Sequence, residues 1–310
     1  MPIPIVVDCD PGHDDALALM LALASPELEV RGITTVGGNA TLEHTTENAL
    51  RVLTLLGRTD VPVAAGASAP LVGPLHTAPQ VHGASGLEGA DLPAPAAAAR
   101  PEGAVEFLAG LLRATDEPLT LVPTGPLTNI ALLLEHQPQL RDRIGRICLM
   151  GGSAGEGNVT PSAEFNIWVD PEAARIVFRS GLPLTMIGLD VTHQALLMAD
   201  ETAALAATGG KVARTVADLL AFYMRFHRER YGWNGSPIHD AVAVAHLARP
   251  GMVKTAPYYV DVELAGELTR GRTVVDTRDV LGRPPNAEVG VGIDRRAFVE
   301  LLVEAIRSFG

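Results

Sequence analysis

Hydrophobic and polar positions follow two alternating patterns along the first two thirds of the chain. Short hydrophobic runs rich in Val, Ile and Leu predict buried β-strands, and longer segments with a helical repeat predict α-helices. The expected strands cover residues 3–8, 30–36, 61–65, 119–123, 146–152 and 184–190. The expected helices begin at Asp14 and Leu127 or cover 42–56, 102–114 and 170–180. This alternation predicts an α/β fold with a mostly parallel central sheet flanked by helices on both faces.

The last third of the chain continues with a different pattern. Residues 200–250 are mainly helical, and weaker strands at 258–264, 272–276 and 287–293 precede a closing helix. The Ala- and Pro-rich stretch 94–104 is similar to a linker, but the alternation resumes after it, so we expect a surface loop. No internal repeat is visible. We therefore expect a single domain over residues 1–310.

Composition narrows the class of protein. The chain has 310 residues, 47% of them hydrophobic, and a formal net charge of -12, which allows a large core and opposes binding to nucleic-acid phosphates. Cys9 and Cys148 are the only cysteines, so neither a disulfide framework nor a cysteine zinc site is expected. The start of the chain lacks a basic export signal and no apolar run reaches the length of a membrane span. These features predict a cytoplasmic protein with no membrane or nucleic-acid partner.

Four aspartates crowd the end of the first expected strand, in "DCDPGHDD" at residues 8–15. Asp8 and Asp10 lie two apart on a strand and so point to one side, and a Pro-Gly turn leads to Asp14 and Asp15 at a helix start. Complementing a helix N-terminus explains one such acid. Four would repel one another without a cation or a network of donors. The cluster therefore predicts a metal site, and all-oxygen ligands favour Ca²⁺ or Mg²⁺.

Other polar residues end expected strands or begin expected helices in the same way. Each one alone is as readily a turn or helix-capping residue, but ligand sites of parallel sheets lie at the carboxyl ends of strands. The candidates are Asn39, Thr124, Glu164, Asn166, His239 and Asp240. His82, in the Gly-rich "VHGASGLEG", is either a loop-bracing residue or a substrate contact.

Taken together, these motifs resemble the inosine-uridine-preferring nucleoside N-ribohydrolase family. The opening D-x-D-P-G-x-D-D signature is followed, in family order, by "GGN" at 37–39, "HGASGL" at 82–87, "TGPLTNIA" at 124–131, "MGG" at 150–152, "AEFNIWVDPEAA" at 163–174 and "IHDAVAVA" at 238–245. The resemblance spans most of the chain and implies the open, Rossmann-like nucleoside hydrolase fold. It also implies homodimers or homotetramers and a role in nucleoside salvage.

The resemblance further implies a bound Ca²⁺. Its ligands would be the side chains of Asp10, Asp15 and Asp240 and the main-chain carbonyl of Thr124, with Asp8 as support. Carbonyl ligation would leave the Thr124 side chain without a required role. The residues expected to hydrogen-bond the ribose are Asp14, Asn39, Glu164 and Asn166.

The implied reaction is hydrolysis of the C1′ to N bond, through a ribosyl group with oxocarbenium character. By analogy Asp10 takes the proton of the attacking water. His239 is the expected proton donor to the leaving base because a histidine can titrate near neutrality, and His82 is expected to contact the base. Residues 226–237, "FHRERYGWNGSP", are expected to form a lid that carries Tyr231, or alternatively a solvated helix end.

The sequence is most similar to the pyrimidine-preferring bacterial branch of the family, which predicts uridine and cytidine as preferred substrates. A purine-preferring or broad-specificity hydrolase is the alternative. Two remoter readings are a haloacid-dehalogenase-type phosphatase, which would need a suitable lysine although only Lys211 and Lys254 exist, and a non-catalytic nucleoside-binding protein.

Overall fold

The computed structural model describes all of residues 1–310. A nine-stranded sheet runs through it in the order β10-β9-β11-β6-β5-β4-β1-β2-β3. The strands are β1 (Ile3–Cys9), β2 (Leu28–Thr35), β3 (Val63–Ala65), β4 (Leu119–Pro123), β5 (Ile144–Met150), β6 (Leu184–Ile187), β9 (Val253–Val262), β10 (Thr273–Asp276) and β11 (Ala287–Ile293). All neighbours from β11 to β3 pair in parallel, and β9 and β10 pair antiparallel. The expected α/β fold with a mostly parallel sheet is confirmed.

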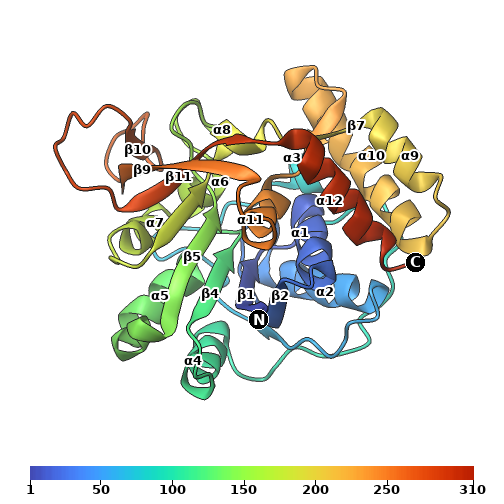
Figure 1. The fold of residues 1–310 in the computed structure, drawn as a ribbon, viewed down its shortest axis with the longest axis horizontal. Helices are drawn as coiled ribbons and strands as arrows, with labels where there is room; N and C mark the ends of the chain where they lie inside the picture. The colour runs from blue at the N-terminus through green and yellow to red at the C-terminus, as the bar shows by residue number, and fades with distance from the viewer.

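Helices cover both faces of this sheet (Figure 1). One face packs against α1 (His13–Ala24), α2 (Leu42–Leu55), α10 (Lys211–Tyr231), α11 (His239–Ala248) and α12 (Arg295–Arg307), and the other against α4 (Ala104–Ala114), α5 (Thr128–His136) and α7 (Pro171–Phe178). Side chains of β1 alternate between these layers: Ile5, Val7 and Cys9 enter one core cluster and Val6 the other. The period-two alternation of a strand explains this division.

The remaining elements are short. They are α3 (Pro79–His82), the 3₁₀ helix η1 (Pro138–Arg143), α6 (Phe165–Val169), α8 (Leu189–Thr192), β7 (Leu196–Met198), α9 (Ala199–Ala206) and β8 (Gly235–Pro237). β7 and β8 form a separate two-stranded antiparallel sheet. The expected lid at 226–237 is in large part regular structure, because residues up to Tyr231 close α10 and 235–237 form β8. Gly232 ends the helix with φ 71°, a left-handed conformation that suits glycine.

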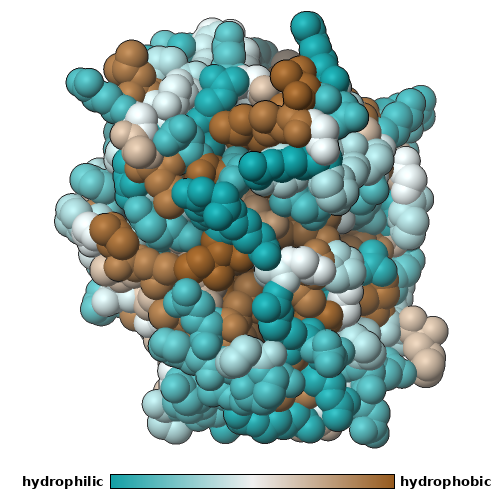
Figure 2. Space-filling view, turned by 90° about the vertical axis from the view of Figure 1, so that its left-hand side faces the viewer, coloured by the Kyte–Doolittle hydropathy of each residue, from teal (hydrophilic) through white to brown (hydrophobic).

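The face at the β9–β10 end of the sheet is not uniformly polar. Figure 2 shows hydrophobic side chains interrupting its hydrophilic surface. Four large exposed hydrophobic residues belong to the β9–β10 connection, β10 and the loop that follows it: Leu268, Val274, Val280 and Leu281. No helix in the structure is both long enough and apolar enough to cross a bilayer.

Candidate active site

The site lies where the parallel strands β1, β2, β4 and β5 end side by side. Asp10 directly follows β1 and Thr124 directly follows β4, and Asn39 lies in the turn after β2. The main-chain N–H of Thr124 donates to the carbonyl of Asp8 (2.8 Å), which joins the ends of the two strands. Polar groups from segments far apart in the sequence therefore meet at one edge of the sheet, as the sequence predicted.

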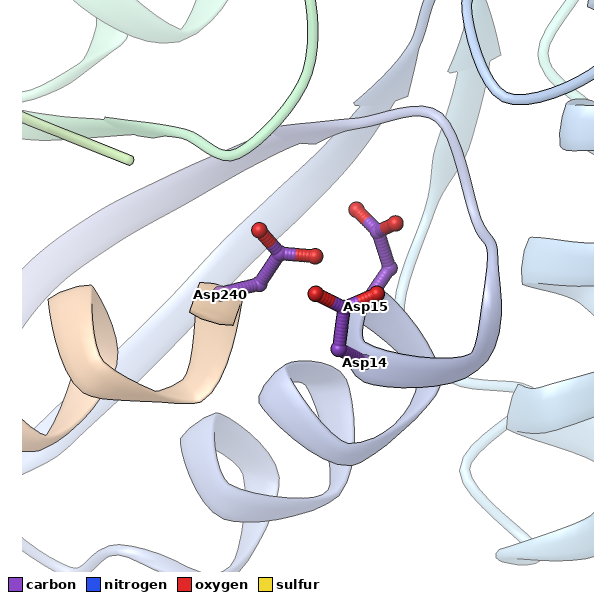
Figure 3. Close-up of side chains that lie close together, drawn as sticks. All are labelled: Asp14, Asp15 and Asp240. Atoms are coloured by element: carbon purple, nitrogen blue, oxygen red, sulfur yellow. The ribbon is translucent and has the colours of Figure 1, made fainter. Parts of the chain in front are cut away.

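Three buried carboxylates converge on one point. Oxygens of Asp14, Asp15 and Asp240 lie within 4.8 Å of one another. Figure 3 shows Asp14 and Asp15 at the start of α1 and Asp240 at the start of α11. Helix N-termini carry partial positive charge, which offsets part of the repulsion between the carboxylates. Two members of this cluster, Asp15 and Asp240, are among the expected side-chain ligands, and Asp14 is an expected ribose contact.

Asp10 lies beside this cluster in a narrow space between two loops. Its Oδ2 accepts the main-chain N–H of Asn39 (2.6 Å), and its Oδ1 is buried without any partner. A Cβ on Gly38 would lie 2.1 Å from the Asp10 carboxylate, and one on Gly125 would lie 2.5 Å away. The glycines of "GGN" and "TGP" thus leave room for this side chain. An unpartnered carboxylate oxygen this deep in a protein is costly unless a cation or a substrate group meets it.

Asp8 is held by side chains from β2 and α5. It lies on the α5 side of the sheet, where its Oδ1 accepts hydrogen bonds from Thr34 Oγ1 (2.6 Å) and Asn129 Nδ2 (2.8 Å). Asn129 also reaches the carbonyl of Thr35 and the N–H of Ala67. It ties three strand ends together, and sequence reasoning missed it although it lies in the "TGPLTN" motif.

Thr124 uses both of its polar groups. Its hydroxyl donates to Asp15 Oδ1 (2.8 Å), and its carbonyl accepts from Asn166 Nδ2 (2.7 Å). The resemblance implied only a carbonyl ligand at Thr124, and the structure adds a hydroxyl that holds a carboxylate of the cluster. The carbonyl keeps a second lone pair that can face a cation.

Burial raises the pKa of every carboxyl in this group. Desolvation raises the pKa of Asp8 to about 6 and that of Asp14 to about 8, with Asp15 adding repulsion on Asp14. The pKa values of Asp10, Asp15 and Asp240 are also raised, chiefly by desolvation. No Lys or Arg lines the pocket to compensate them. Asp8 Oδ2 and Asp10 Oδ1 are both buried without a partner, and an all-oxygen, negatively charged set of this kind suits a hard divalent cation.

The expected ribose-binding residues surround the same pocket. Glu164 caps α6, and its carboxylate accepts N–H groups of Gly152, Asn166 and Ile167 at 2.9 to 3.1 Å. Asn166 directs Nδ2 to the Thr124 carbonyl, which leaves its Oδ1 as a free acceptor. Asn39 Nδ2 lies 3.2 Å from both the Asp10 carbonyl and Asp15 Oδ2. These side chains are held in place before any ligand binds.

The pocket has an empty volume of about 730 Å³ and joins the carboxylates to a wall of rings. It brings together Asp14, Asn39, His82, Thr124, Glu164, Asn166, Tyr231, His239 and Asp240 among the expected residues. Asp10 and Asp15 do not line it. Sequence reasoning did not single out His193, Tyr223, Phe226 and His227, which also line it. Phe226 and His227 belong to the segment expected to cover the base, whereas nothing in the sequence pattern marks His193.

The ring wall is built mainly at the end of α10. Tyr231 stacks on Trp233 with centroids 4.5 Å apart and planes at 19°, and His227 lies parallel to Trp233 at 6.1 Å. The Tyr231 ring also lies tilted against His193 and edge-on to Phe226. Flat, partly polar rings of this kind suit a planar aromatic ligand.

His239 faces the pocket from the start of α11. Its Nδ1 lies 2.7 Å from Thr192 Oγ1, and burial lowers its pKa well below the ordinary value. Burial therefore disfavours the charged form of this ring in the free protein. Proton donation from this ring requires either its N–H in the neutral form or a bound substrate that raises its pKa.

The two lysines do not serve this pocket. Lys211 at the start of α10 and Lys254 in β9 are both exposed, and neither lines the site. A phosphatase of the haloacid-dehalogenase type needs a lysine beside its aspartates. The structure offers none.

Comparison with known proteins agrees with this geometry. The family model described as inosine-uridine preferring nucleoside hydrolase matches residues 5–300. The chain is 52% identical over 310 residues to the pyrimidine-specific ribonucleoside hydrolase RihA of Enterobacter sp. (strain 638), which covers 100% of this chain and 99% of the relative. It is 53% identical over 307 residues to RihA of Shewanella sp. (strain ANA-3), covering 99% of this chain and 96% of that protein.

The solved structures that superpose on this chain are also nucleoside hydrolases. A purine-preferring ribonucleoside hydrolase from Gardnerella vaginalis superposes with a TM-score of 0.93 at 37% identity, over 99% of this chain and 98% of that one. The plant nucleoside hydrolase PpNRh1 superposes with a TM-score of 0.92 at 33% identity, over 99% of each chain. From the family match and the full-length identity it follows that this chain belongs to the inosine-uridine preferring nucleoside hydrolase family.

Proposed function

We propose that this protein hydrolyses the N-glycosidic bond of ribonucleosides, with pyrimidine nucleosides preferred and Ca²⁺ as its metal ion. The observation that carries the proposal is one pocket that joins a buried carboxylate cluster to a wall of aromatic and imidazole rings. The first part suits a polyhydroxylated sugar with a cation, and the second suits a flat base. The RihA relatives are pyrimidine-specific ribonucleoside hydrolases, which supports the pyrimidine preference.

The cation would be held by the side chains of Asp10, Asp15 and Asp240 and by the carbonyl of Thr124. The unpartnered Oδ1 of Asp10 supports its inclusion. Asp14 is close enough to contribute. A bound Ca²⁺ supplies a positive charge that keeps these carboxylates ionised, orients ribose hydroxyls and makes a nearby water more acidic.

Cation binding should strengthen as pH rises. Without a cation, a carboxyl whose pKa is raised by folding favours the folded state only while it is protonated. For Asp14 this contribution to stability is complete below the pKa of 3.8 in the unfolded chain, and it is lost as the pH rises through the folded-state pKa of about 8. A cation removes this loss by pairing with the ionised form. We expect the rise in Tm caused by Ca²⁺, relative to chelated protein, to be larger at about pH 9 than at about pH 7.

Thermal melts at the two pH values, with Ca²⁺ or with excess chelator, measure this directly. Buried histidines with lowered pKa values, such as His13 at about 4, reduce the stability of the protein only at acidic pH. They therefore do not affect the comparison between pH 7 and pH 9. A Tm gain that is absent, or equal at both pH values, would contradict the assignment of these carboxylates as ligands.

In the reaction, Asp10 accepts the proton of the water that attacks C1′. Its carboxylate is buried beside the Asp14, Asp15 and Asp240 cluster, where the surrounding negative charge favours positive charge on the ribosyl group. Asp14, Glu164 and Asn166 hold the ribose hydroxyls. Since these groups are buried, a deoxyribose would leave one of them without a partner, at a cost in binding and rate.

The leaving base needs help of a different kind. A purine can accept a proton at N7, whereas a pyrimidine must be helped at its carbonyl oxygen. His239 faces the pocket and is the proposed donor, with Tyr231 and the rings around it covering the base. A donor placed for the pyrimidine carbonyl is the feature that would separate this protein from a purine-preferring relative.

The proposal is tested with the purified protein and four nucleosides. We expect kcat/KM for uridine and cytidine to exceed that for inosine and adenosine by about tenfold or more, with free ribose as product and no requirement for phosphate. A preference for inosine over uridine would support the purine-preferring alternative. Binding without turnover would support a non-catalytic nucleoside-binding protein instead.

The proposal extends to assembly and location. We propose a homodimer or homotetramer in the cytoplasm, acting in nucleoside salvage. The exposed hydrophobic residues of the β9–β10 end support association of copies, because exposed apolar patches commonly mark interfaces. Sedimentation velocity measures the assembly, and a monomer would contradict this part.

A further inference from the structure

Two buried histidines, His13 and His82, meet directly behind the pocket. Their Nδ1 atoms lie 3.0 Å apart, a hydrogen-bond distance that requires a proton on one of the two nitrogens. His82 lines the pocket, and its Nε2 makes no hydrogen bond within the protein. His13 does not line the pocket and has no part in the function proposed above.

The far side of His13 determines which of its nitrogens carries a proton. His13 Nε2 lies 2.7 Å from the main-chain carbonyl of Glu88. A carbonyl oxygen can only accept a hydrogen bond, so Nε2 must carry the proton. In a neutral imidazole the other nitrogen, Nδ1, is then a bare acceptor.

His13 lies in surroundings that favour its neutral form. Its ring stacks between Phe222, Tyr223 and His82, with interplanar angles of 3° and 4° to the first two, and it is fully buried. No carboxylate hydrogen-bonds the ring. The proton between the two rings therefore belongs to His82 Nδ1, and His82 Nε2 is bare.

One further contact makes the opposite demand. The main-chain N–H of His13 points to His82 Nδ1 at 3.3 Å, which would suit a bare nitrogen there. That contact is longer than the ring–ring contact at 3.0 Å. A bare His82 Nδ1 would place the proton between the rings on His13 Nδ1. His13 would then either have a bare Nε2 facing the Glu88 carbonyl, which is a second acceptor, or carry protons on both nitrogens as a buried charged ring. The shorter pair of contacts therefore determines the tautomer.

Packing prevents His82 from turning away from this arrangement. A Cβ on Gly12 would lie 2.6 Å from His82 Nδ1 and 2.9 Å from Asn39 Nδ2, so the ring is wedged against the Gly12 main chain. Tyr223 stacks on its other side at 5.3 Å. The orientation of the ring and the position of its proton are both set by the protein.

We propose that His13 is a positioning residue that, anchored on the Glu88 carbonyl, holds His82 in the tautomer with a bare Nε2, so that His82 accepts a hydrogen bond from an N–H or O–H group of the bound nucleoside. This inference rests on the proposed function for the nature of the ligand. It assigns His82 to recognition and leaves proton donation to another residue.

Two substitutions at His13 separate its two contacts. Asn in place of His13 keeps an acceptor near the position of Nδ1 and loses the Glu88 bond, whereas Gln keeps a donor near Nε2 and loses the acceptor. We expect His13→Gln to lower kcat/KM for uridine by about tenfold or more, mainly through KM, and His13→Asn to lose clearly less. Equal losses in both variants would overturn the proposal.

A double-mutant cycle with His82→Ala distinguishes positioning from packing. If His13 acts through His82, His13→Gln should cost nothing further in the His82→Ala protein. An undiminished cost in that background would show that His13 has only a structural role. Thermal melts of all four proteins confirm that the comparison is made between folded enzymes.

A spectroscopic measurement tests the tautomer without any turnover. In protein labelled with ¹⁵N-histidine, the imidazole spectrum of His82, assigned by its disappearance in His82→Ala, should show Nδ1 protonated and Nε2 bare. In His13→Gln this pattern should change. A proton on Nε2 in the wild-type protein would overturn the inference, whereas a protein with the expected spectrum and no nucleoside hydrolysis would overturn only the proposed function.

Discussion

Asp10→Asn should lower kcat for uridine by a factor of about 10³ or more, because the substitution removes both a proton acceptor and a negative charge at the reacting carbon. The amide keeps one oxygen that can still accept the Asn39 N–H, while its NH₂ group replaces the unpartnered Oδ1. The side chain should therefore stay in place. Steady-state kinetics with uridine measure the loss.

The same substitution should not harm the fold. Burial and neighbouring Asp15 raise the pKa of Asp10, so removing its charge relieves repulsion in the cation-free protein. We expect the Tm of chelated Asp10→Asn to equal or exceed that of the chelated wild type, and the Tm gain from Ca²⁺ to shrink. Asp116→Asn is the matched control, since Asp116 is exposed in the loop before β4, away from the site. Near-normal kcat in folded Asp10→Asn would remove Asp10 from the chemistry.

His239→Ala should lower kcat/KM for uridine by about 10² or more through loss of the proton donor to the leaving base. The effect should nearly vanish on a riboside with an activated leaving group such as p-nitrophenol, which departs without a proton. Comparing both substrates on both proteins measures the difference. An equal loss on the two substrates would mean that His239, the neighbour of Asp240, acts on the sugar or the cation instead.

A substitution at Thr192 tests the same proton donation with a smaller expected effect. Its hydroxyl is the partner of His239 Nδ1 at 2.7 Å. Thr192→Val keeps a similar shape and removes the hydrogen bond, so it should produce a smaller loss with the same dependence on the leaving group. A loss in Thr192→Val that is independent of the leaving group would indicate disturbed packing rather than disturbed proton donation.

The sequence alone determined the layers of the fold and one edge of the site. The hydrophobic run at residues 3–8 and the helical segment after it depend on short-range preferences, so β1 and α1 could be located without any tertiary contact. Because carboxyl ends of parallel strands meet at one edge, the placement of Asp10, Asn39 and Thr124 together also followed from the pattern. Asp240 was a candidate from its place at a helix start, but only the resemblance connected it with the aspartates at the start of α1.

Only the tertiary structure decided which groups touch and in what state they exist. The packing of α1 against α11 brings Asp14 and Asp15 together with Asp240. The segment expected to form a lid is instead the end of α10 and a strand, because the helix continues past residue 226 until Gly232 ends it.

The contact between His13 and His82 joins residues 69 positions apart. The charge of His239 depends on how much solvent its surroundings exclude. Hydrogen-bond partners and desolvation are properties of the packed chain, and short-range sequence preferences contain no information about them.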